Sequence, residues 1–291
     1  MPDINPMAPT SAVFNPISPL DFSYTVHETL LDVQDVSVSY DRPILRDVNF
    51  EIKNIVRPGH SQGQINALLA PSGMGKSQAF RVMAGLQKPN SGKVTLEDGT
   101  KVSAGSVGVV YQDYPLFKHL TVWENLLLAS KIRLPDRKAR EEVCLQYLDS
   151  FGLSDRQKNY PHELSGGMRQ RVSIIQQVVS CGHMLLMDEP FSGLDIIRKE
   201  EVQGLIQRIA ASHEKNSIVI TTHDISAALA IADTVDILGR ERGTDGQLIP
   251  GARIMYRYNL MDMGITWRQN NHELPQFAEL EREIKARFHE I

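Results

Sequence analysis

The chain has 291 residues with 42% hydrophobic and 23% charged side chains, and its 31 basic and 35 acidic residues give a net charge of −4. General nucleic-acid-binding proteins carry a basic excess, so we expect no nucleic acid among the partners. No apolar run approaches the ~18 residues that cross a bilayer, and the two cysteines lack metal-ligand spacing. No apolar segment of the secretory type lies near residue 1, so we expect no secretory signal. We therefore expect a cytoplasmic protein that does not cross a membrane by itself.

Residues 1–29 are expected to form a tail without regular structure, because they hold five of the fifteen prolines and show no hydrophobic period. From residue 30 onward, apolar residues alternate with polar ones in the manner of half-buried antiparallel strands. The alternating residues are Val36, Val38, Val48, Phe50 and Ile52. Further on, Asp98 and Gly99 separate two short β-prone runs, which predicts a hairpin.

Short apolar runs that are followed by helical stretches predict a parallel sheet with helices on both faces. The predicted buried strands are residues 65–70, 107–111, 184–187 and 218–222. The predicted helices are residues 76–86, 166–180 and 224–232. This alternation places the chain in the α/β class, with a parallel core sheet and an additional antiparallel β subdomain.

Two further regions are predicted, one inside a main domain of residues 30–239 and one after it. Residues 113–165 are expected to form an inserted helical subdomain. Residues 240–291 form a short C-terminal extension whose last helix carries an apolar stripe. The stripe consists of Phe277, Leu280, Ile284, Phe288 and Ile291. We expect it to pack on the core or in a dimer, with membrane contact as the alternative.

A glycine-containing loop follows the strand at 65–70 and leads into the helix that begins at residue 76. Its residues are Ala70, Pro71, Ser72, Gly73, Met74, Gly75, Lys76 and Ser77. Glycines let successive backbone N–H groups turn toward one anion, and the helix N-terminus adds positive potential. Lys76 would then reach the β- and γ-phosphates of a nucleotide, and the Ser77 hydroxyl would bind Mg²⁺. The loop predicts a nucleotide site, with an ordinary glycine-rich turn as the alternative.

An acidic pair ends the buried strand at 184–187. Asp188 would hold Mg²⁺ through water, and Glu189 would orient or deprotonate an attacking water. Acidic pairs at strand ends also occur in ordinary turns, but the phosphate loop supplies the matching half of a hydrolytic site.

The segment 164–172 contains a second helix N-terminus suited to anions. Ser165, Gly166 and Gly167 open this helix, so one chain carries two half-sites, which suggests that each is completed by a partner molecule. Residues 164–171 read Leu-Ser-Gly-Gly-Met-Arg-Gln-Arg. On these motifs, residues 30–239 resemble the nucleotide-binding subunit of an ATP-binding cassette transporter.

The resemblance assigns roles to further residues. Tyr40 matches the aromatic residue that stacks on adenine, and Gln112 matches the glutamine that senses Mg²⁺ and the attacking water. Asp195 matches the tip of the loop that meets the partner subunit, and His223 matches the histidine that contacts the γ-phosphate. Taken alone, a tyrosine that ends a strand is more often ordinary packing, and a lone histidine is more often structural or solvent-exposed.

Two positions depart from the family pattern. Ala70 replaces the usual first glycine of the phosphate loop, which is tolerable if its φ is negative. Gln78 stands where the family has a threonine whose hydroxyl helps to hold the α-phosphate, and the Gln78 amide could donate instead. Neither departure removes a group needed for the chemical step.

The resemblance implies a P-loop NTPase fold, with ATP and Mg²⁺ as cofactors. It also implies that two cassette subunits, as a homodimer or a pair, enclose two ATP molecules between the Lys76 loop of one chain and Ser165 of the other. The residues implied to be catalytic are Glu189, His223, Lys76 and Gln112. Ser77, Gln112 and Asp188 are the implied Mg²⁺ ligands, and Gln78 and Asp195 are further nucleotide contacts.

The resemblance finally implies separate permease subunits that span the membrane, and it places this chain on the inner face of that membrane as a peripheral subunit. Import is the favoured direction of transport. Residues 114–125 resemble importers of nitrate, sulfonate and taurine and of amino acids, which work with a solute-binding protein. An exporter or a lipid-moving cassette stays open, because direction resides mainly in the permease. A non-transport cassette would usually carry a coiled coil, zinc cysteines or tandem cassettes, and a P-loop kinase would lack the string at 164–171.

Overall fold

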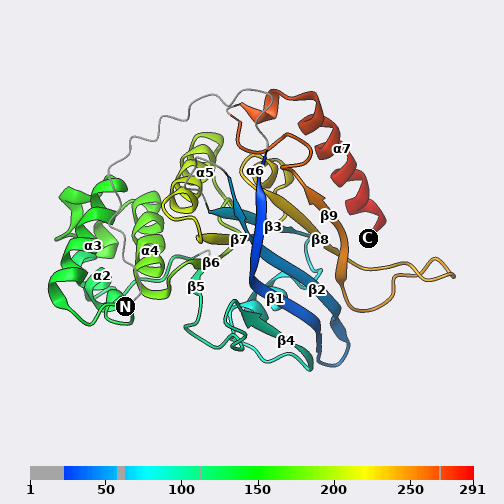
Figure 1. Ribbon diagram of the computed structural model, residues 1–291, viewed down its shortest axis with the longest axis horizontal. Coiled ribbons are helices and arrows are strands. Elements are labelled where there is room, and N and C mark those ends of the chain that lie inside the picture. Colours follow the sequence, from blue (N-terminus) through cyan, green and yellow to red (C-terminus); the bar gives the residue numbers. More distant parts are fainter. Residues whose placement is uncertain (1–22, 58–62, 112, 269) are drawn as a thin grey trace.

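The computed structural model describes residues 23–57, 63–111, 113–268 and 270–291, and its centre is a six-stranded sheet (Figure 1). The strand order is β5-β6-β7-β3-β8-β9, with β9 antiparallel to β8 and the other pairings parallel. The strands are β3 (Gln64–Leu69), β5 (Gly108–Val110), β6 (Met184–Asp188), β7 (Ser217–Thr222), β8 (Thr234–Gly239) and β9 (Arg253–Asn259). The four buried strands predicted from the sequence correspond to β3, β5, β6 and β7.

A three-stranded antiparallel sheet in the order β2-β1-β4 packs on one face of the central sheet. Its strands are β1 (Thr25–Ser39), β2 (Pro43–Val56) and β4 (Ser91–Leu96). The residues predicted to alternate inward are all buried, and Val36 and Ile52 among them are each 1% exposed. Strand β1 begins at Thr25, so regular structure starts five residues before the predicted boundary at residue 30.

The predicted hairpin at Asp98 and Gly99 is only partly formed. The turn is present, and the Val102 N–H donates to the Val94 carbonyl at 3.0 Å. The second arm contributes a single isolated bridge between Thr95 and Lys101, and β4 pairs along its length with β1 instead. The long β1 strand offers β4 a continuous partner, which the short second arm does not.

Seven α-helices lie within the described residues. They are α1 (Lys76–Met83), α2 (Val122–Ser130), α3 (Arg137–Ser150), α4 (Gly166–Cys181), α5 (Ile196–Ala211), α6 (Ile225–Leu229) and α7 (Pro275–Glu290), with 3₁₀ turns η1 (Ser154–Arg156), η2 (Pro161–Glu163) and η3 (Asn271–Glu273). Helices α2 and α3 form the inserted helical region at one side of the molecule (Figure 1). None of the described helices is long and apolar enough to span a membrane.

The segment after residue 239 is continuous with the core rather than an appendage. Its strand β9 extends the central sheet, and α7 covers the helical face of that sheet at the end opposite α2 and α3 (Figure 1). The stripe residues Phe277, Leu280 and Ile284 are at most 3% exposed. The stripe therefore packs on the core, and the predicted boundary at 239 separates two paired strands.

The parallel arrangement determines where the site lies. Residues on alternate sides of β3 enter two hydrophobic clusters, with Ile65, Ala67 and Leu69 on the helical side and Leu68 facing the antiparallel sheet. Because β3, β6 and β7 run in the same direction, the segments that follow them all emerge at one end of the sheet.

Candidate active site

The phosphate loop emerges from β3 and turns into α1. Gly73 and Gly75 have φ values of 82° and 88°, a left-handed conformation that residues with a Cβ rarely adopt. A Cβ on Gly75 would lie 3.0 Å from the Leu45 side chain, so this position has little room for a larger residue. Helix α1 has no side-chain cap, and its first N–H groups are therefore suited to an anionic ligand.

Lys76, the first residue of α1, is buried beneath this loop. Its Nζ donates to the Ala70 carbonyl at 2.8 Å and lies 3.4 Å from Oε1 of Glu189. Ala70 itself is not among the residues with positive φ, so the departure from glycine is accommodated without strain. The ammonium is held at the junction between the phosphate loop and the acidic strand end.

The acidic pair at the end of β6 is held by two threonines of the neighbouring strand β7. The Thr221 hydroxyl donates to Asp188 at 2.6 Å, and the Thr222 hydroxyl donates to Glu189 at 3.0 Å. The Glu189 N–H also donates to the Thr221 carbonyl at 2.8 Å. Glu189 has a φ of 48°, a costly conformation for a non-glycine residue, and such outliers cluster at functional sites.

His223 follows β7 directly and completes the cluster around Glu189. Its Nδ1 lies 3.0 Å from both carboxylate oxygens of Glu189. An ionised carboxylate can only accept, so Nδ1 carries the proton, and in the neutral ring Nε2 is left with its lone pair. The imidazole is 54% exposed, which leaves it accessible to a ligand.

Lys76, Glu189 and His223 therefore form one contact cluster at the carboxyl end of the parallel strands. It contains a cation suited to phosphate charge, a carboxylate suited to a water proton, and an imidazole. Gln112, the fourth residue expected here, lies outside the described residues.

Tyr40 and Gln78 also lie together. Tyr40 follows β1 and is 63% exposed, and its hydroxyl donates to Oε1 of Gln78 at 3.1 Å. Ser72, Gly73 and Ser77 are exposed beside them on the phosphate loop. The loop surface is thus open to a ligand, and Met74 and Pro71 are partly exposed within it.

Ser165 and its glycines lie elsewhere in the same chain. The Ser165 hydroxyl accepts from the Met168 N–H at 3.3 Å and caps α4. Beside it is a hollow of about 820 Å³. The described residues that line this hollow come from segments 113–114, 165–171 and 194–208, and none comes from the phosphate loop. Within the described residues, the phosphate loop therefore does not border the hollow beside Ser165.

Asp195 caps α5, and its carboxylate accepts from the Arg198 N–H at 2.9 Å. The hydrogen bond and the ion pair of this carboxylate within the described residues are both with Arg198. Three supporting residues were not predicted: Thr221 and Thr222 hold the acidic pair, and the buried Gln170 donates to the Pro190 carbonyl at 3.3 Å. The consecutive threonines before His223 on a buried strand are the signal that could have revealed the first two.

The residues expected to bind Mg²⁺ have suitable chemistry. Mg²⁺ prefers oxygen ligands and is usually held by one or two protein groups together with substrate phosphates and water. Ser77 offers an exposed hydroxyl, and Asp188 offers a carboxylate fixed by Thr221. Within the described residues, no group of three or more His, Cys, Asp or Glu side chains forms a metal site by itself, so a metal here would depend on a bound phosphate.

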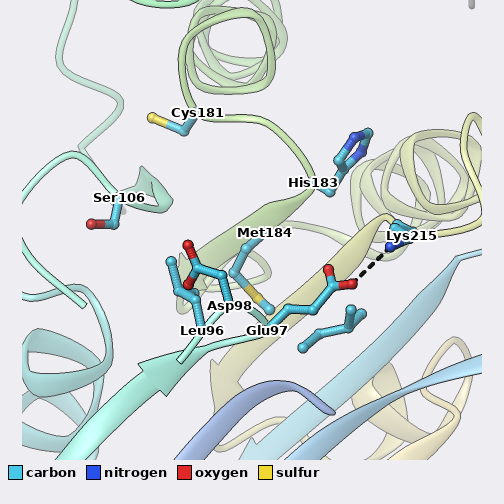
Figure 2. Close-up of a pocket in the computed structure, with 9 residues that line it drawn as sticks. Leu96, Glu97, Asp98, Ser106, Cys181, His183, Met184 and Lys215 are labelled. Atoms are coloured by element: carbon cyan, nitrogen blue, oxygen red, sulfur yellow. Dashed lines mark hydrogen bonds and ion pairs between the residues drawn. The ribbon is translucent and has the colours of Figure 1, made fainter. Parts of the chain in front are cut away.

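Another hollow, of about 450 Å³, lies at the opposite end of the strands (Figure 2). Glu97 and Lys215 pair there at 2.8 Å, and Met184, the first residue of β6, lines it. Because the acidic pair lies at the carboxyl ends of β6 and β7, this hollow is separate from the Lys76 cluster.

Comparisons with known proteins identify the family of the chain. Residues 54–192 match the ABC transporter family. The chain is 31% identical over 271 residues to the sulfate/thiosulfate import ATP-binding protein CysA of Gloeobacter violaceus, covering 89% of this chain and 75% of that protein. The chain belongs to the family of ABC transporter ATP-binding proteins.

One more relative and one solved structure of similar fold extend the comparison. The aliphatic sulfonates import ATP-binding protein SsuB 1 of Rhodococcus jostii is 33% identical, over 78% of this chain and 86% of that protein. A solved dimer of the ATP-binding cassette MJ0796, in a post-hydrolysis state with ADP and Pi, has a TM-score of 0.63 at 24% identity, covering 79% of this chain and 99% of that one. As an ABC transporter ATPase, the chain binds ATP and hydrolyses it.

Proposed function

We propose that this ABC transporter ATPase drives import of a small solute through separate membrane-spanning permease subunits, from the cytoplasmic face of the membrane. The contact cluster of Lys76, Glu189 and His223 carries the proposal, because it unites the groups that γ-phosphate hydrolysis requires. The relatives named for sulfate, thiosulfate and aliphatic sulfonates support a small sulfur-containing oxyanion as the solute and a solute-binding protein that delivers it.

In the proposed chemical step, water attacks the γ-phosphorus in line with the bond to the leaving oxygen. The new bond joins the water oxygen to phosphorus, the bond to the β-phosphate oxygen breaks, and ADP and phosphate leave. Glu189 orients the water and accepts its proton, and Lys76 stabilises negative charge on the transferring group. His223, whose Nδ1–H is held by Glu189, contacts the γ-phosphate through its other nitrogen when that nitrogen is protonated.

Ser77, Asp188 and Gln112 are the proposed Mg²⁺ ligands. When bound, Mg²⁺ neutralises charge on the β- and γ-phosphates. The chain's own contribution is to fix the Asp188 carboxylate through Thr221 and to present Ser77 on the first turn of α1.

Two subunits are proposed to complete each other's sites, with Ser165 of one chain bound to nucleotide on Lys76 of the other. The separation of the two half-sites within the chain supports this arrangement. Both half-sites lie at helix N-termini with positive potential, and a polyanionic nucleotide can bridge them. Binding would close the dimer, and hydrolysis would remove the bridge.

Mixing two variants tests the composite site. Ser165→Arg should block closure and leave nucleotide binding by the monomer nearly intact, whereas Lys76→Ala should weaken binding directly. A mixed dimer keeps one unaltered site, so ATP-dependent association, measured by light scattering on size exclusion, should return on mixing. Two results together would overturn the arrangement in which two chains enclose the nucleotide. Mixtures would associate no better than either variant alone, and ATP would never dimerise the unmutated chain.

The solute class needs a separate test in cells. Loss of this chain should abolish uptake of [³⁵S]sulfate or of a labelled aliphatic sulfonate, and Glu189→Gln should fail to restore it. Normal uptake of both solutes in its absence would contradict the proposed class while leaving the ATPase assignment intact.

A further inference from the structure

The side chain of Gln78 links helix α1, which follows the phosphate loop, to the antiparallel sheet. Gln78 lies on the first turn of α1, and Tyr40 follows β1 of the antiparallel sheet. The Tyr40 hydroxyl donates to Gln78 Oε1 at 3.1 Å. Tyr40 is 63% exposed, so this hydrogen bond, rather than packing, holds its hydroxyl group beside helix α1.

This hydrogen bond fixes the direction of the Gln78 amide. Oε1 faces the phenol because a hydroxyl donates to it, so the NH₂ group faces the other way. The Gln78 backbone N–H is already used, since it donates to the Gly75 carbonyl at 2.9 Å. The NH₂ group therefore presents two side-chain donors on the first turn of a helix whose N-terminus is suited to anions.

We infer that the Tyr40 hydroxyl orients the Gln78 amide for the phosphate contact that the family makes with a threonine at this position. In this arrangement the Gln78 NH₂ donates to a phosphate oxygen of the bound nucleotide, and Tyr40 acts on that phosphate only through Gln78. Tyr40 is thus a positioning residue in addition to any contact of its ring with the base. The inference rests on the proposed nucleotide site around Lys76.

The chemistry favours this relay, in which the Tyr40 hydroxyl acts on the phosphate through the Gln78 amide. A phenol that donates to the amide oxygen polarises the amide and strengthens its N–H groups as donors. A Gln side chain held in one orientation also loses less rotamer freedom when it binds phosphate. Removing the Tyr40 hydroxyl should therefore cost nearly as much nucleotide affinity as removing the Gln78 amide itself.

A double-mutant cycle on the full chain tests the relay. The variants are Tyr40→Phe, Gln78→Ala and the double variant, with Kd for MgATP measured by isothermal titration calorimetry. Tyr40→Phe keeps the ring and removes only the hydroxyl. We expect each single change to raise Kd about tenfold, the loss typical of a hydrogen bond to a charged group, and the double change to raise it no further. Fully additive losses, or an unchanged Kd for Tyr40→Phe, would overturn the relay.

Two further measurements distinguish the proposed role of Tyr40 and Gln78 in phosphate binding from a purely structural role. Gln78→Thr places a hydroxyl directly on the helix, so in that background Tyr40→Phe should have no effect on Kd. Inorganic tripolyphosphate, which has no ribose or base, should show the same Gln78→Ala loss in competition against a fluorescent nucleotide. A loss confined to ATP would assign the Gln78 contact to ribose or base and overturn the phosphate assignment.

Tyr258→Phe is the matched control, because it removes a hydroxyl that donates to Glu283 at 2.8 Å outside the nucleotide site. Its Kd for MgATP should equal that of the unmutated chain. Lys76→Ala separates this inference from the proposed site itself. If Lys76→Ala weakens binding while the cycle is additive, only the relay fails. If Lys76→Ala binds ATP normally, the proposed site fails.

Discussion

Lys76 Nζ lies 3.4 Å from Glu189 Oε1, so two residues assigned to the γ-phosphate form an ion pair with each other. Their side chains are only 10% and 17% exposed, which strengthens the attraction relative to a surface pair. A bound nucleotide must compete with the carboxylate for this ammonium. The pair therefore holds the lysine in place until phosphate replaces its partner.

Glu189→Gln should leave ATP binding at least as strong as in the unmutated chain and should abolish turnover. The change removes the negative charge that holds Lys76, and it also removes the proton acceptor. We expect steady-state hydrolysis to fall by ~10²–10⁴-fold. Phosphate release and calorimetry measure the two effects, and an unchanged rate of hydrolysis would show that Glu189 is not the catalytic carboxylate.

Thr222→Val should reduce turnover through Glu189. The Thr222 hydroxyl donates to Glu189 at 3.0 Å and accepts from the Asp224 N–H at 3.1 Å, so its loss frees the carboxylate to move. A hydrogen bond to a charged group contributes about 1.5–3 kcal/mol, so kcat should fall at least about tenfold while KM changes little. Thr222→Ser keeps the hydroxyl and should restore activity, and equal rates for Thr222→Val and Thr222→Ser would contradict this role.

Ile284→Ala should destabilise the chain, because the α7 stripe packs on the core. Ile284 is fully buried, and such truncations cost about 2–5 kcal/mol. Urea unfolding measures the change, with the exposed Glu279→Ala on the same helix as the control. If the stripe instead served a dimer or a membrane, Ile284→Ala would leave the unfolding free energy of the monomer unchanged.

The contribution of His213 to stability should fall as the pH drops from about 6.5 toward the lowered pKa of this residue in the folded chain. Burial, followed by the stacked ring of His183 at 4.1 Å, lowers the pKa of His213. The Lys215 N–H also donates to His213 Nδ1 at 3.1 Å, a bond that protonation of Nδ1 would break. A His with a lowered folded pKa binds its proton first in the unfolded chain, so its stabilisation is complete above about pH 6.5 and is lost as the pH falls.

The His213 effect is measured as a difference between two chains. Urea midpoints of the unmutated chain and of His213→Gln, taken from pH 7.5 to 5, should converge as the pH falls. Asp233 and Asp236, whose pKa values burial raises to about 6, act in the opposite direction in both chains and cancel in the difference. A constant gap between the two curves would show that His213 does not titrate in this way.

The sequence predicted most of the site because its motifs follow buried apolar strands. The strand before Asp188 is apolar throughout, and the strand before Ala70 is apolar apart from Gln64 and Asn66. Both are bounded by loop residues, so their carboxyl ends could be located by inspection. Helix α5 was not predicted, because its apolar residues do not all lie on one face. Ile196 and Ile197 at its start are over 70% exposed, and they interrupt the helical spacing of the buried apolar residues that follow. Strand β9 was missed because its residues are only half-buried and follow a weakly patterned loop.

Contacts between motifs could not be predicted from spacing. The hydrogen bonds of Thr221 and Thr222 to the acidic pair arise because β6 and β7 are neighbours in the sheet, although about thirty residues separate them in sequence. The bond between Tyr40 and Gln78 likewise joins two layers whose relative placement depends on packing of the whole core.

The pairing of β9 with β8 has a consequence for any attempt to reduce this protein to a minimal catalytic fragment. A chain cut after Gly239 would retain all the motif residues, but the backbone N–H and C=O groups of β8 that now bond β9 would face solvent. The apolar surface now covered by α7 would be exposed beside them. An unpaired, apolar edge strand is a template for intermolecular β-pairing, so such a fragment should aggregate even though every proposed catalytic group is present.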